Sequence, residues 1–219
     1  MKPAAITGLE AEAHIARRAG LAAEPSGGVA SQTLAIAEGF VRNGAEALVS
    51  VGIAGALAPS LAAGRLLLPR VVVDSTGTRY AVDATWHAGV AQALRRAGLA
   101  VEEGDILGAA EPAASTVRKA ELFRMTQAVA IDLESHLVAA AAARGGKPFL
   151  VLRAVADPAM RTLPPAAING LDARGRPAFG RVLASVLRQP GQIPALLRLA
   201  GDTRRALDAL SSALAVHPF

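Results

Sequence analysis

Short apolar runs alternate along the chain with segments of helical periodicity, and this alternation limits the fold more than any other feature of the sequence. Short, mainly apolar runs of this length are typical of strands that are buried on both faces of a sheet. Such runs occupy residues 3–8, 47–52, 66–73, 104–108, 127–132 and 147–156. Helices are expected at residues 9–20, 30–43, 84–97, 116–125 and 134–143. The pattern predicts an α/β fold with a mixed, mainly parallel central sheet flanked by helices.

Proline and glycine residues interrupt the pattern at two places. Pro69 interrupts the run 66–73, which we interpret as one strand at an edge or a bulge. Residues 25–28 read PSGG and predict a turn.

The composition excludes several classes of protein. A chain of 219 residues with 52% apolar residues can bury a large core, so disorder is excluded and one domain is expected. The absence of cysteine excludes disulfide scaffolds and thiolate-bound metal sites. Charges interrupt every long apolar stretch, and Glu10 and Glu12 interrupt the N-terminal one. We therefore expect no spanning helix, no signal peptide and a cytoplasmic location.

The net charge of +5 is concentrated near the C-terminus. Residues 174–205 carry seven arginines and one acid, Asp202, which gives this segment +6 and leaves −1 elsewhere. A breaker-rich loop leads into a helical pattern at 179–187, and Pro190-Gly191 separates it from a last helix with a leucine face at 196–214. We expect a core at residues 1–165 and, at 166–219, a loop plus a basic amphipathic helical tail packed on it.

Three acidic residues follow three of the expected strands. Glu12, Glu134 and Asp157 stand at or just beyond strand ends, where open α/β sheets place their ligands. Glu12 and Glu134 could equally serve as acids at helix N-termini, and Arg153 could be the ion-pair partner of Asp157. Together the three favour carboxylate acid–base chemistry. The four histidines lack metal-ligand spacing, so no metal site is expected. No serine or cysteine nucleophile elbow is present either.

A segment of small residues follows the second expected strand. Residues 51–57 read VGIAGAL, and their two glycines would let the backbone approach a ligand closely. The segment lacks the G-x-G-x-x-G fingerprint, so a purely structural turn is an equally open interpretation.

Four segments in fixed order carry a family resemblance. They are GLEAE at 8–12, VGIAGAL at 51–57 with Gly64 downstream, DLES at 132–135 and RAVAD at 153–157. Over roughly residues 1–160 the chain resembles the purine nucleoside phosphorylase and methylthioadenosine/S-adenosylhomocysteine nucleosidase superfamily. The resemblance implies a single-domain nucleoside phosphorylase-like fold, with residues 1–165 as the catalytic core.

Within that superfamily the chain is most similar to the hopanoid-associated phosphorylases. The similar segments are ESH at 134–136, FLVLRAVADPA at 149–159, LPPAA at 163–167 and QPGQIPALLRLA at 189–200. The last two are absent from the small soluble nucleosidases. The family is associated with the release of adenine from adenosylhopane, which gives ribosylhopane or phosphoribosylhopane in hopanoid biosynthesis.

The resemblance implies a role for each acid. Asp157 would donate a proton to the purine, Glu134 would hold the ribose hydroxyls, and Glu12 would orient the attacking water or nucleophile. Other residues implied in substrate binding are Leu133, Ile53, Ala54, Gly55, Ser135 and Arg153. A loop for an anion or nucleophile would comprise Gly8, Ser26, Gly27 and Gly28.

Departures from the family pattern bear on the reaction. Ile53 stands where relatives carry a hydroxyl residue, and Glu12 stands where the phosphorylases carry a phosphate-binding arginine. These residues favour hydrolysis, with phosphate as co-substrate the alternative; no cofactor is otherwise expected. No residue of the stretch 109–117 matches the aromatic that stacks on the purine in relatives.

The remaining expectations concern partners. The family implies a homodimer and an adenine nucleoside with a hydrophobic 5′ substituent. A hopane-linked substrate implies a peripheral contact of residues 174–214 with the inner face of the membrane, with plain core packing or a subunit contact as the alternative. The basic tail lacks interleaved aromatics, so nucleic acid is not expected. The alternative functions are a soluble methylthioadenosine/S-adenosylhomocysteine nucleosidase or purine nucleoside phosphorylase, and a non-catalytic hopanoid-assembly binding protein.

Overall fold

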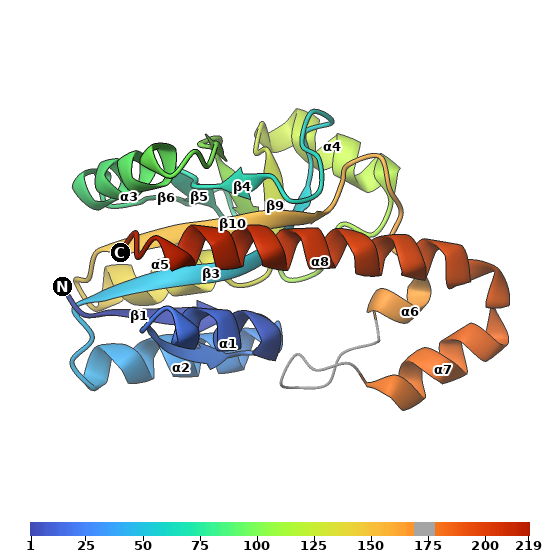
Figure 1. The fold of residues 1–219 in the computed structure, drawn as a ribbon, viewed down its shortest axis with the longest axis horizontal. Coiled ribbons are helices and arrows are strands. Elements are labelled where there is room, and N and C mark those ends of the chain that lie inside the picture. The colour runs from blue at the N-terminus through green and yellow to red at the C-terminus, as the bar shows by residue number, and fades with distance from the viewer. Residues whose placement is uncertain (169–177) are drawn as a thin grey trace.

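Ten strands pair into one sheet in the computed structural model, which describes residues 1–168 and 178–219 (Figure 1). The elements follow in the order β1 (Pro3–Thr7), α1 (Glu10–Arg18), β2 (Ala22–Pro25), α2 (Ala30–Arg42), β3 (Ala47–Ala56), β4 (Leu66–Leu67), β5 (Val71–Val73), β6 (Arg79–Ala81), α3 (Ala84–Arg96), β7 (Val101–Glu102), β8 (Ile106–Gly108), α4 (Thr116–Thr126), β9 (Ala130–Asp132), α5 (Ser135–Arg144), β10 (Phe149–Asp157), α6 (Pro165–Ile168), α7 (Phe179–Arg188), a 3₁₀ turn η1 (Pro190–Gln192) and α8 (Ile193–Ala215).

The long strand β3 lies at the centre of this sheet. One edge of β3 pairs in parallel with β10 along most of its length. Its other edge pairs with β1 over Ala47–Ser50 and with β9 at Gly55 and Ala56. The stretch Val51–Ala54 on that second edge therefore lies between the end of β1 and the end of β9. This interruption in the pairing leaves backbone groups of β3 open to other partners.

The sheet is strongly curved. Its main path runs β6-β5-β8-β9-β3-β10-β4-β7, so β4 and β5 are five strand positions apart. In a flat sheet that separation would be about 24 Å. The four residue steps from Leu67 to Val71 span at most about 14 Å. The sheet must therefore curl around β3 and β10, which carry its most buried residues.

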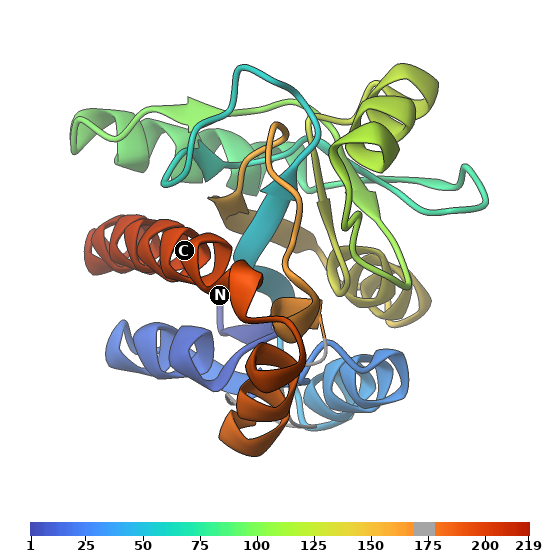
Figure 2. The same cartoon turned by 90° about the vertical axis from the view of Figure 1, so that its right-hand side faces the viewer.

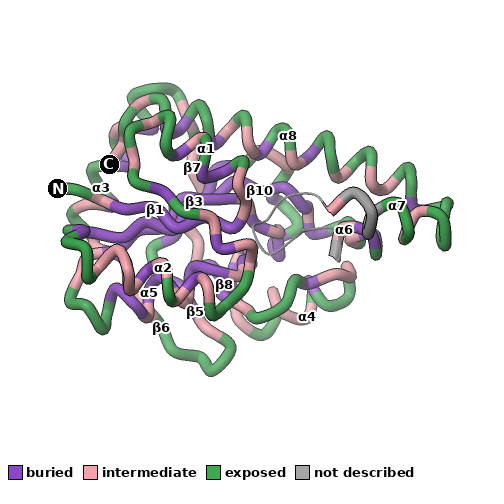
Figure 3. The backbone as a smooth tube through the Cα atoms, turned by 90° about the horizontal axis from the view of Figure 1, so that it is seen from below, coloured by how far each residue is buried: buried purple, intermediate pink, exposed green. Residues whose placement is uncertain are grey.

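Helices cover both faces of the curved sheet. Helices α1 and α8 pack on one side of β3 and β10, and α2 and α5 pack together on the other (Figures 2 and 3). All nine residues of β10 are buried, because neither face is left to solvent. Strands buried on both faces carry continuous apolar side chains, which explains the uniform run at 149–152.

The C-terminal helices are tied to one another and to the core by buried polar side chains. The side-chain oxygen of Gln192 accepts from the backbone N–H of Ala166, and its amide nitrogen donates to the carbonyl of Ser185. Asp202 of α8 is buried and forms ion pairs with Arg161 and Arg205. Helices α6 and α7 stand at the end of the molecule opposite the two termini (Figure 1). Among the described residues, no helix combines the length and apolar character needed to cross a membrane.

The predicted fold class is confirmed, including the mixed, mainly parallel sheet and the helical C-terminus. Two local expectations are wrong. The run 66–73 forms two separate strands with different partners, since β4 pairs with β10 and β5 with β8. Residues 52–56 continue β3 instead of turning. The turn predicted at 25–28 is present but begins at Ser26, because Ala22–Pro25 form a strand beside β1.

Candidate active site

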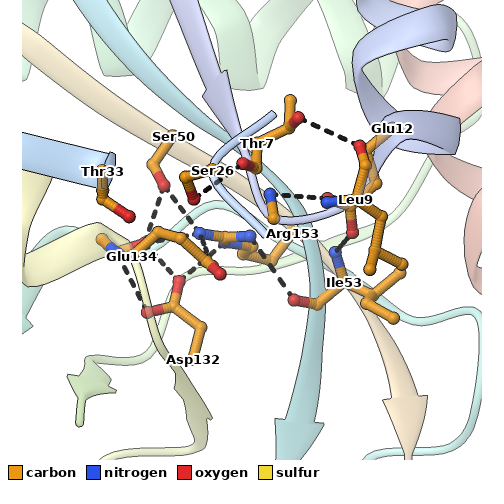
Figure 4. Close-up of polar contacts among 12 residues, drawn as sticks. Thr7, Leu9, Glu12, Ser26, Thr33, Ser50, Ile53, Asp132, Glu134 and Arg153 are labelled. Carbon is orange, nitrogen blue, oxygen red and sulfur yellow. Dashed lines mark hydrogen bonds and ion pairs between the residues drawn. The ribbon is translucent and has the colours of Figure 1, made fainter. Parts of the chain in front are cut away.

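A cluster of buried polar side chains fills the interruption in the pairing of β3 (Figure 4). It contains Glu12 from α1, Asp132 from β9, Glu134 at the start of α5 and Arg153 from β10. The polypeptide brings these four together because β1, β9 and β10 all pair directly with β3. We call this group the carboxylate cluster.

Glu12 closes the gap on the edge of β3. Its Oε1 accepts the backbone N–H of Ile53 at 2.8 Å, and its Oε2 accepts those of Gly8 and Leu9 at 2.9 and 2.7 Å. Glu12 occupies the third position of α1, so it also caps that helix as its acidic residue. Glu12 can therefore be an acid at the helix N-terminus and a residue of the candidate site at once. Burial raises the pKa of Glu12, and the charge of Arg153 opposes that rise.

Glu10 has a different place from Glu12. It lies on the surface of α1 and pairs with Arg17 at 2.9 Å. Such a pair contributes little to stability, and Glu10 takes no part in the carboxylate cluster.

Arg153 lies across β3 to reach the acids on its far side. Its register partner on β3 is Gly52, and a Cβ at Gly52 would stand 2.3 Å from Nη1 of Arg153. Only glycine leaves room for this crossing. The guanidinium then contacts Asp132 (Nε to Oδ2, 2.7 Å) and Glu134 (Nη2 to Oε2, 3.0 Å), and donates to the hydroxyl of Ser50 at 2.7 Å.

The pKa of Glu134 is raised in the carboxylate cluster. Burial, reinforced by the charges of Asp132 and Glu12, raises the pKa of Glu134 from 4.5 to about 7, although Arg153 opposes the rise. Burial is the main cause, and the single guanidinium of Arg153 does not offset it because it faces three buried carboxylates. Glu134 also lies close to the loop after β1, because a Cβ at Gly8 would meet its Oε1 at 2.7 Å.

Ser135 holds Asp132 of the carboxylate cluster in place. Asp132 accepts hydrogen bonds from the backbone N–H and the hydroxyl of Ser135. Ser135 is fully buried and its hydroxyl also contacts that of Ser50 at 3.2 Å. The structure therefore places Ser135 behind the carboxylates. Its predicted contact with substrate has no counterpart among these bonds and stays a prediction.

Asp157 stands apart from the cluster because of a β-bulge. The register of β10 against β3 shifts between Val155, which faces Ala54, and Asp157, which faces Gly55. The extra residue breaks the side-chain alternation after Val155, and in the described part of the chain Arg153 pairs with Asp132 and Glu134 and not with Asp157. The predicted alternative of an Arg153–Asp157 ion pair is therefore wrong. Instead, Nζ of Lys119 on α4 lies 2.6 Å from Oδ2 of Asp157.

The proton affinity of Asp157 reflects two opposed effects. Burial raises the pKa of Asp157, and the hydrogen bond and charge of Lys119 pull it down without cancelling the rise. Part of the side chain remains in contact with solvent, with 12% of it exposed.

The apolar residues predicted to contact substrate lie between these acidic groups. Ile53, Gly55 and Leu133 are half-buried, whereas Ala54 is buried. Ile53 and Gly55 belong to the C-terminal half of β3, and Leu133 lies within reach of Gly28. The partly exposed atoms of these residues are the ones a bound molecule could touch.

The predicted anion loop is folded back onto β1. The backbone N–H groups of Ser26 and Gly27 donate to the carbonyls of Thr7 and Gly8 at 2.8 and 2.9 Å, and the Ser26 hydroxyl donates to Thr7 at 3.1 Å. Gly27 and Gly28 both have positive φ, which explains the two adjacent glycines. These hydrogen bonds occupy two of the backbone donors that an anion would need.

Sequence reasoning missed Lys119 and Ser50. Lys119 is a single lysine in an ordinary helical segment, and Ser50 lies inside an apolar strand, so neither carries a motif. Their roles depend on which strands become neighbours. As to metals, the described residues contain no group of three or more His, Cys, Asp or Glu side chains that could hold an ion.

The raised pKa of Glu134 predicts a pH-dependent stability. The unfolded carboxyl ionises near 4.5 and the folded one near 7, so the folded state binds the extra proton between these values. The contribution of Glu134 to the free energy of unfolding is therefore largest at low pH and falls as pH rises from 4.5 to 7.

We expect the stability difference between wild type and Glu134→Gln to change by on the order of 3 kcal/mol across this interval. Urea unfolding of both proteins between pH 4 and 8 measures it. A difference that stays constant with pH would contradict the assigned environment of Glu134.

Comparison with known proteins identifies the fold and the family. A family model described as the phosphorylase superfamily matches residues 15–188. A comparison with curated proteins finds no match. The structure resembles a futalosine hydrolase mutant of Helicobacter pylori strain 26695, with 15% identity, a TM-score of 0.71 and coverage of 97% of this chain and 98% of that one.

Nucleosidases resemble the chain to a similar degree. The 5′-methylthioadenosine/S-adenosylhomocysteine nucleosidase from Neisseria meningitidis, in complex with methylthio-immucillin-A, has 20% identity and a TM-score of 0.69, with 98% and 99% of the two chains covered. The Campylobacter jejuni nucleosidase has 17% identity and a TM-score of 0.67, with 90% and 99% covered. At these identities the likeness establishes the fold.

These findings bear on the sequence-based expectations. The alignment with the Neisseria nucleosidase extends over 98% of this chain, so the C-terminal helices do not set its fold apart from the nucleosidases. The expectation of an enzyme from the nucleosidase and nucleoside phosphorylase superfamily is confirmed. The chain belongs to the phosphorylase superfamily.

Proposed function

We propose that this protein cleaves the N-glycosidic bond of an adenine nucleoside with water, and that its substrate is adenosylhopane. The observation that carries the proposal is the placement of buried carboxylates on both sides of the C-terminal half of β3. Glu12 approaches Gly52, and Asp157 approaches Gly55. The two glycines are three residues apart, or about 10 Å along the strand. A nucleoside spanning that interval would meet one acid near its sugar and another near its base.

Cleavage of this bond separates charge in a way that the acids would stabilise. The electron pair of the C1′–N9 bond passes to the purine, and positive charge develops on the ribose. Asp157 would protonate N7 of the departing adenine, since burial favours its protonated form. Glu134 would bind the ribose hydroxyls and stabilise the cationic sugar, as Arg153 fixes one of its oxygens.

Glu12 is the proposed base that activates water. Its oxygens accept three backbone N–H groups, which fix the carboxylate in place. Burial raises its pKa, which makes the carboxylate more basic. The water proton would pass to Glu12 as the oxygen bonds to C1′.

The surroundings of Glu12 support water over phosphate as the acceptor. Arg153, the cation beside it, is already paired with Asp132 and Glu134. The N–H groups of Ser26 and Gly27 are bonded to the carbonyls of Thr7 and Gly8. Phosphate at this place would meet a carboxylate and donors that are already occupied.

The proposed hopane substituent is supported by the sequence resemblance and by apolar side chains on the C-terminal helices. Leu187 on α7 is 74% exposed and Leu197 on α8 is 69% exposed, with Leu183 and Ile193 also at the surface. Arg188 and Arg198 are interspersed with them and, within the described residues, form no ion pair. We propose that these residues contact the membrane that holds the substrate, at its inner face.

The membrane contact that we propose is shorter than the expected segment 174–214. Leu210 and Leu214 are buried against the core, so the later half of α8 is a packing helix. Arg205 is paired with Asp202. Arg174 and Arg176 lie outside the described residues. The proposed contact is therefore residues 183–198, and homodimerisation stays a proposal from the family resemblance.

A second candidate is the hydrolysis of methylthioadenosine or S-adenosylhomocysteine. It is favoured by the fold match with the Neisseria meningitidis nucleosidase, which extends over nearly the whole of both chains. The two candidates share the bond that breaks and differ in the size of the 5′ substituent.

Incubation with adenosylhopane, with and without phosphate, tests the proposed reaction. We expect adenine and ribosylhopane at equal rates in both buffers, and a loss of about 10²–10⁴-fold in the rate for Asp157→Asn. Adenine release measured by chromatography provides the readout. Strict phosphate dependence would refute hydrolysis, and a preference for methylthioadenosine would favour the second candidate.

Flotation with anionic vesicles tests the membrane contact. The wild type should float at low salt and less at high salt, because headgroup attraction is screened. Leu187→Ser combined with Leu197→Ser should abolish flotation, whereas Met125→Ser, an equally exposed change on α4, should leave it intact. Equal flotation of all three proteins, or none, would rule out a contact through residues 183–198.

A further inference from the structure

Lys119 on α4 is a buried charge that the proposed roles above leave unexplained. It is 1% exposed and, with Arg153, belongs to the largest fully buried side chains of the described chain. An ammonium group is strongly disfavoured in such a place unless it is paired and hydrogen-bonded. Its partners therefore indicate why the fold tolerates it.

The three N–H bonds of the Lys119 ammonium have three acceptors. Nζ lies 2.6 Å from Oδ2 of Asp157, 3.0 Å from the carbonyl oxygen of Pro158 and 2.8 Å from that of Arg161. An ammonium has three donors and no acceptor, so this arrangement matches the protonated amine and uses all of its hydrogens. Lys119 thus holds the Asp157 carboxylate and the two carbonyl groups in place.

These contacts determine the orientation of Asp157. One oxygen of its carboxylate is held by Lys119, and the other makes no hydrogen bond within the described residues. The same lysine fixes the backbone of the segment 158–161 that follows the bulge of β10. The carboxylate that carries this second oxygen is therefore restrained by a side chain from a different element, α4.

The segment after Asp157 is also joined to the loop before α4. The N–H of Leu163 donates to the carbonyl of Ala114 at 2.8 Å. Lys119 and this hydrogen bond together connect α4 and the loop before it to the segment 158–163 that follows Asp157.

We propose that Lys119 is a positioning residue, which aims Asp157 at the departing base and limits the pH range in which Asp157 can donate a proton. The inference rests on the proposed glycosidic cleavage with Asp157 as its acid. In that step the proton moves from Asp157 to N7 as the C1′–N9 bond breaks. Lys119 keeps its own three hydrogens throughout.

The charges around Asp157 give the direction of the pH effect. Lys119 faces it from α4, and Arg161, which is paired with Asp202 of α8, adds a weaker positive field. Both lower the pKa of Asp157, whereas burial raises it. Removal of the lysine charge leaves burial less opposed, so Asp157 would keep its proton to a higher pH. An acid catalyst loses activity as it deprotonates, so the falling limb of the pH–rate profile would move to higher pH.

The test is the pH dependence of adenine release, measured with both adenosylhopane and methylthioadenosine. Lys119→Met removes the charge at similar length, and Lys119→Gln removes it but keeps two N–H donors. In both variants we expect the falling limb of kcat/KM to move up by about one pH unit or more. We also expect kcat to fall by about 10-fold or more, with little change in KM. Lys119→Arg keeps the charge, so its kcat/KM should fall at the same pH as that of the wild type.

Asp157→Asn separates failure of this inference from failure of the proposed function. If Asp157→Asn stops adenine release and the limb of both uncharged lysine variants stays at the wild-type pH, Lys119 has only a structural role and the inference is wrong. If Asp157→Asn keeps the wild-type rate, the proposed acid is wrong, and the role of Lys119 falls with it. Thermal unfolding of each variant identifies any that lost activity by failing to fold, and Lys119→Gln serves if Lys119→Met does not fold.

Discussion

The position of Arg153 is the constraint on which the arrangement of this site depends. Its guanidinium crosses β3 above Gly52 and reaches acids that come from β9 and from the start of α5. A buried ion pair is costly unless its remaining donors and acceptors are satisfied. Here Ser50 and Ser135 supply further oxygens. Within the described residues, Arg153 is the cation that pairs with the acids which β9 and the start of α5 bring to β3.

The charge of Arg153 does not fully offset the buried carboxylates, and this affects their pKa values. Three carboxylates share one guanidinium, so burial keeps the proton affinities of Glu12 and Glu134 above their ordinary values. Groups that exchange protons near neutral pH are suited to acid–base chemistry. Asp157 follows the bulge in β10 and pairs with Lys119 instead of with Arg153. The fold thereby keeps two acidic environments apart along one strand.

Much of the fold and three of the acids could be predicted from the sequence, because apolar runs and helical periodicity mark the alternation of strands and helices. Glu12, Glu134 and Asp157 follow from their places at strand ends. Their partners could not be predicted. Residues 149–157 are buried on both faces, so no alternation of polar and apolar side chains reveals the bulge that separates Asp157 from Arg153. Likewise nothing in the sequence around Lys119 distinguishes it from a solvated lysine, since its burial arises from contacts with a loop forty residues away. The split of 66–73 into β4 and β5 reflects the curvature of the whole sheet.

The central claim is that buried carboxylates stabilise a cationic ribose as an adenine base departs. Calorimetric titration can compare adenosine with an adenosine analogue whose ribose ring carries a protonated nitrogen. A site complementary to the transition state should bind the cationic analogue at least about 100-fold more tightly than adenosine, and Glu134→Gln should remove most of that preference. Equal affinity of the wild type for the two compounds would contradict the account.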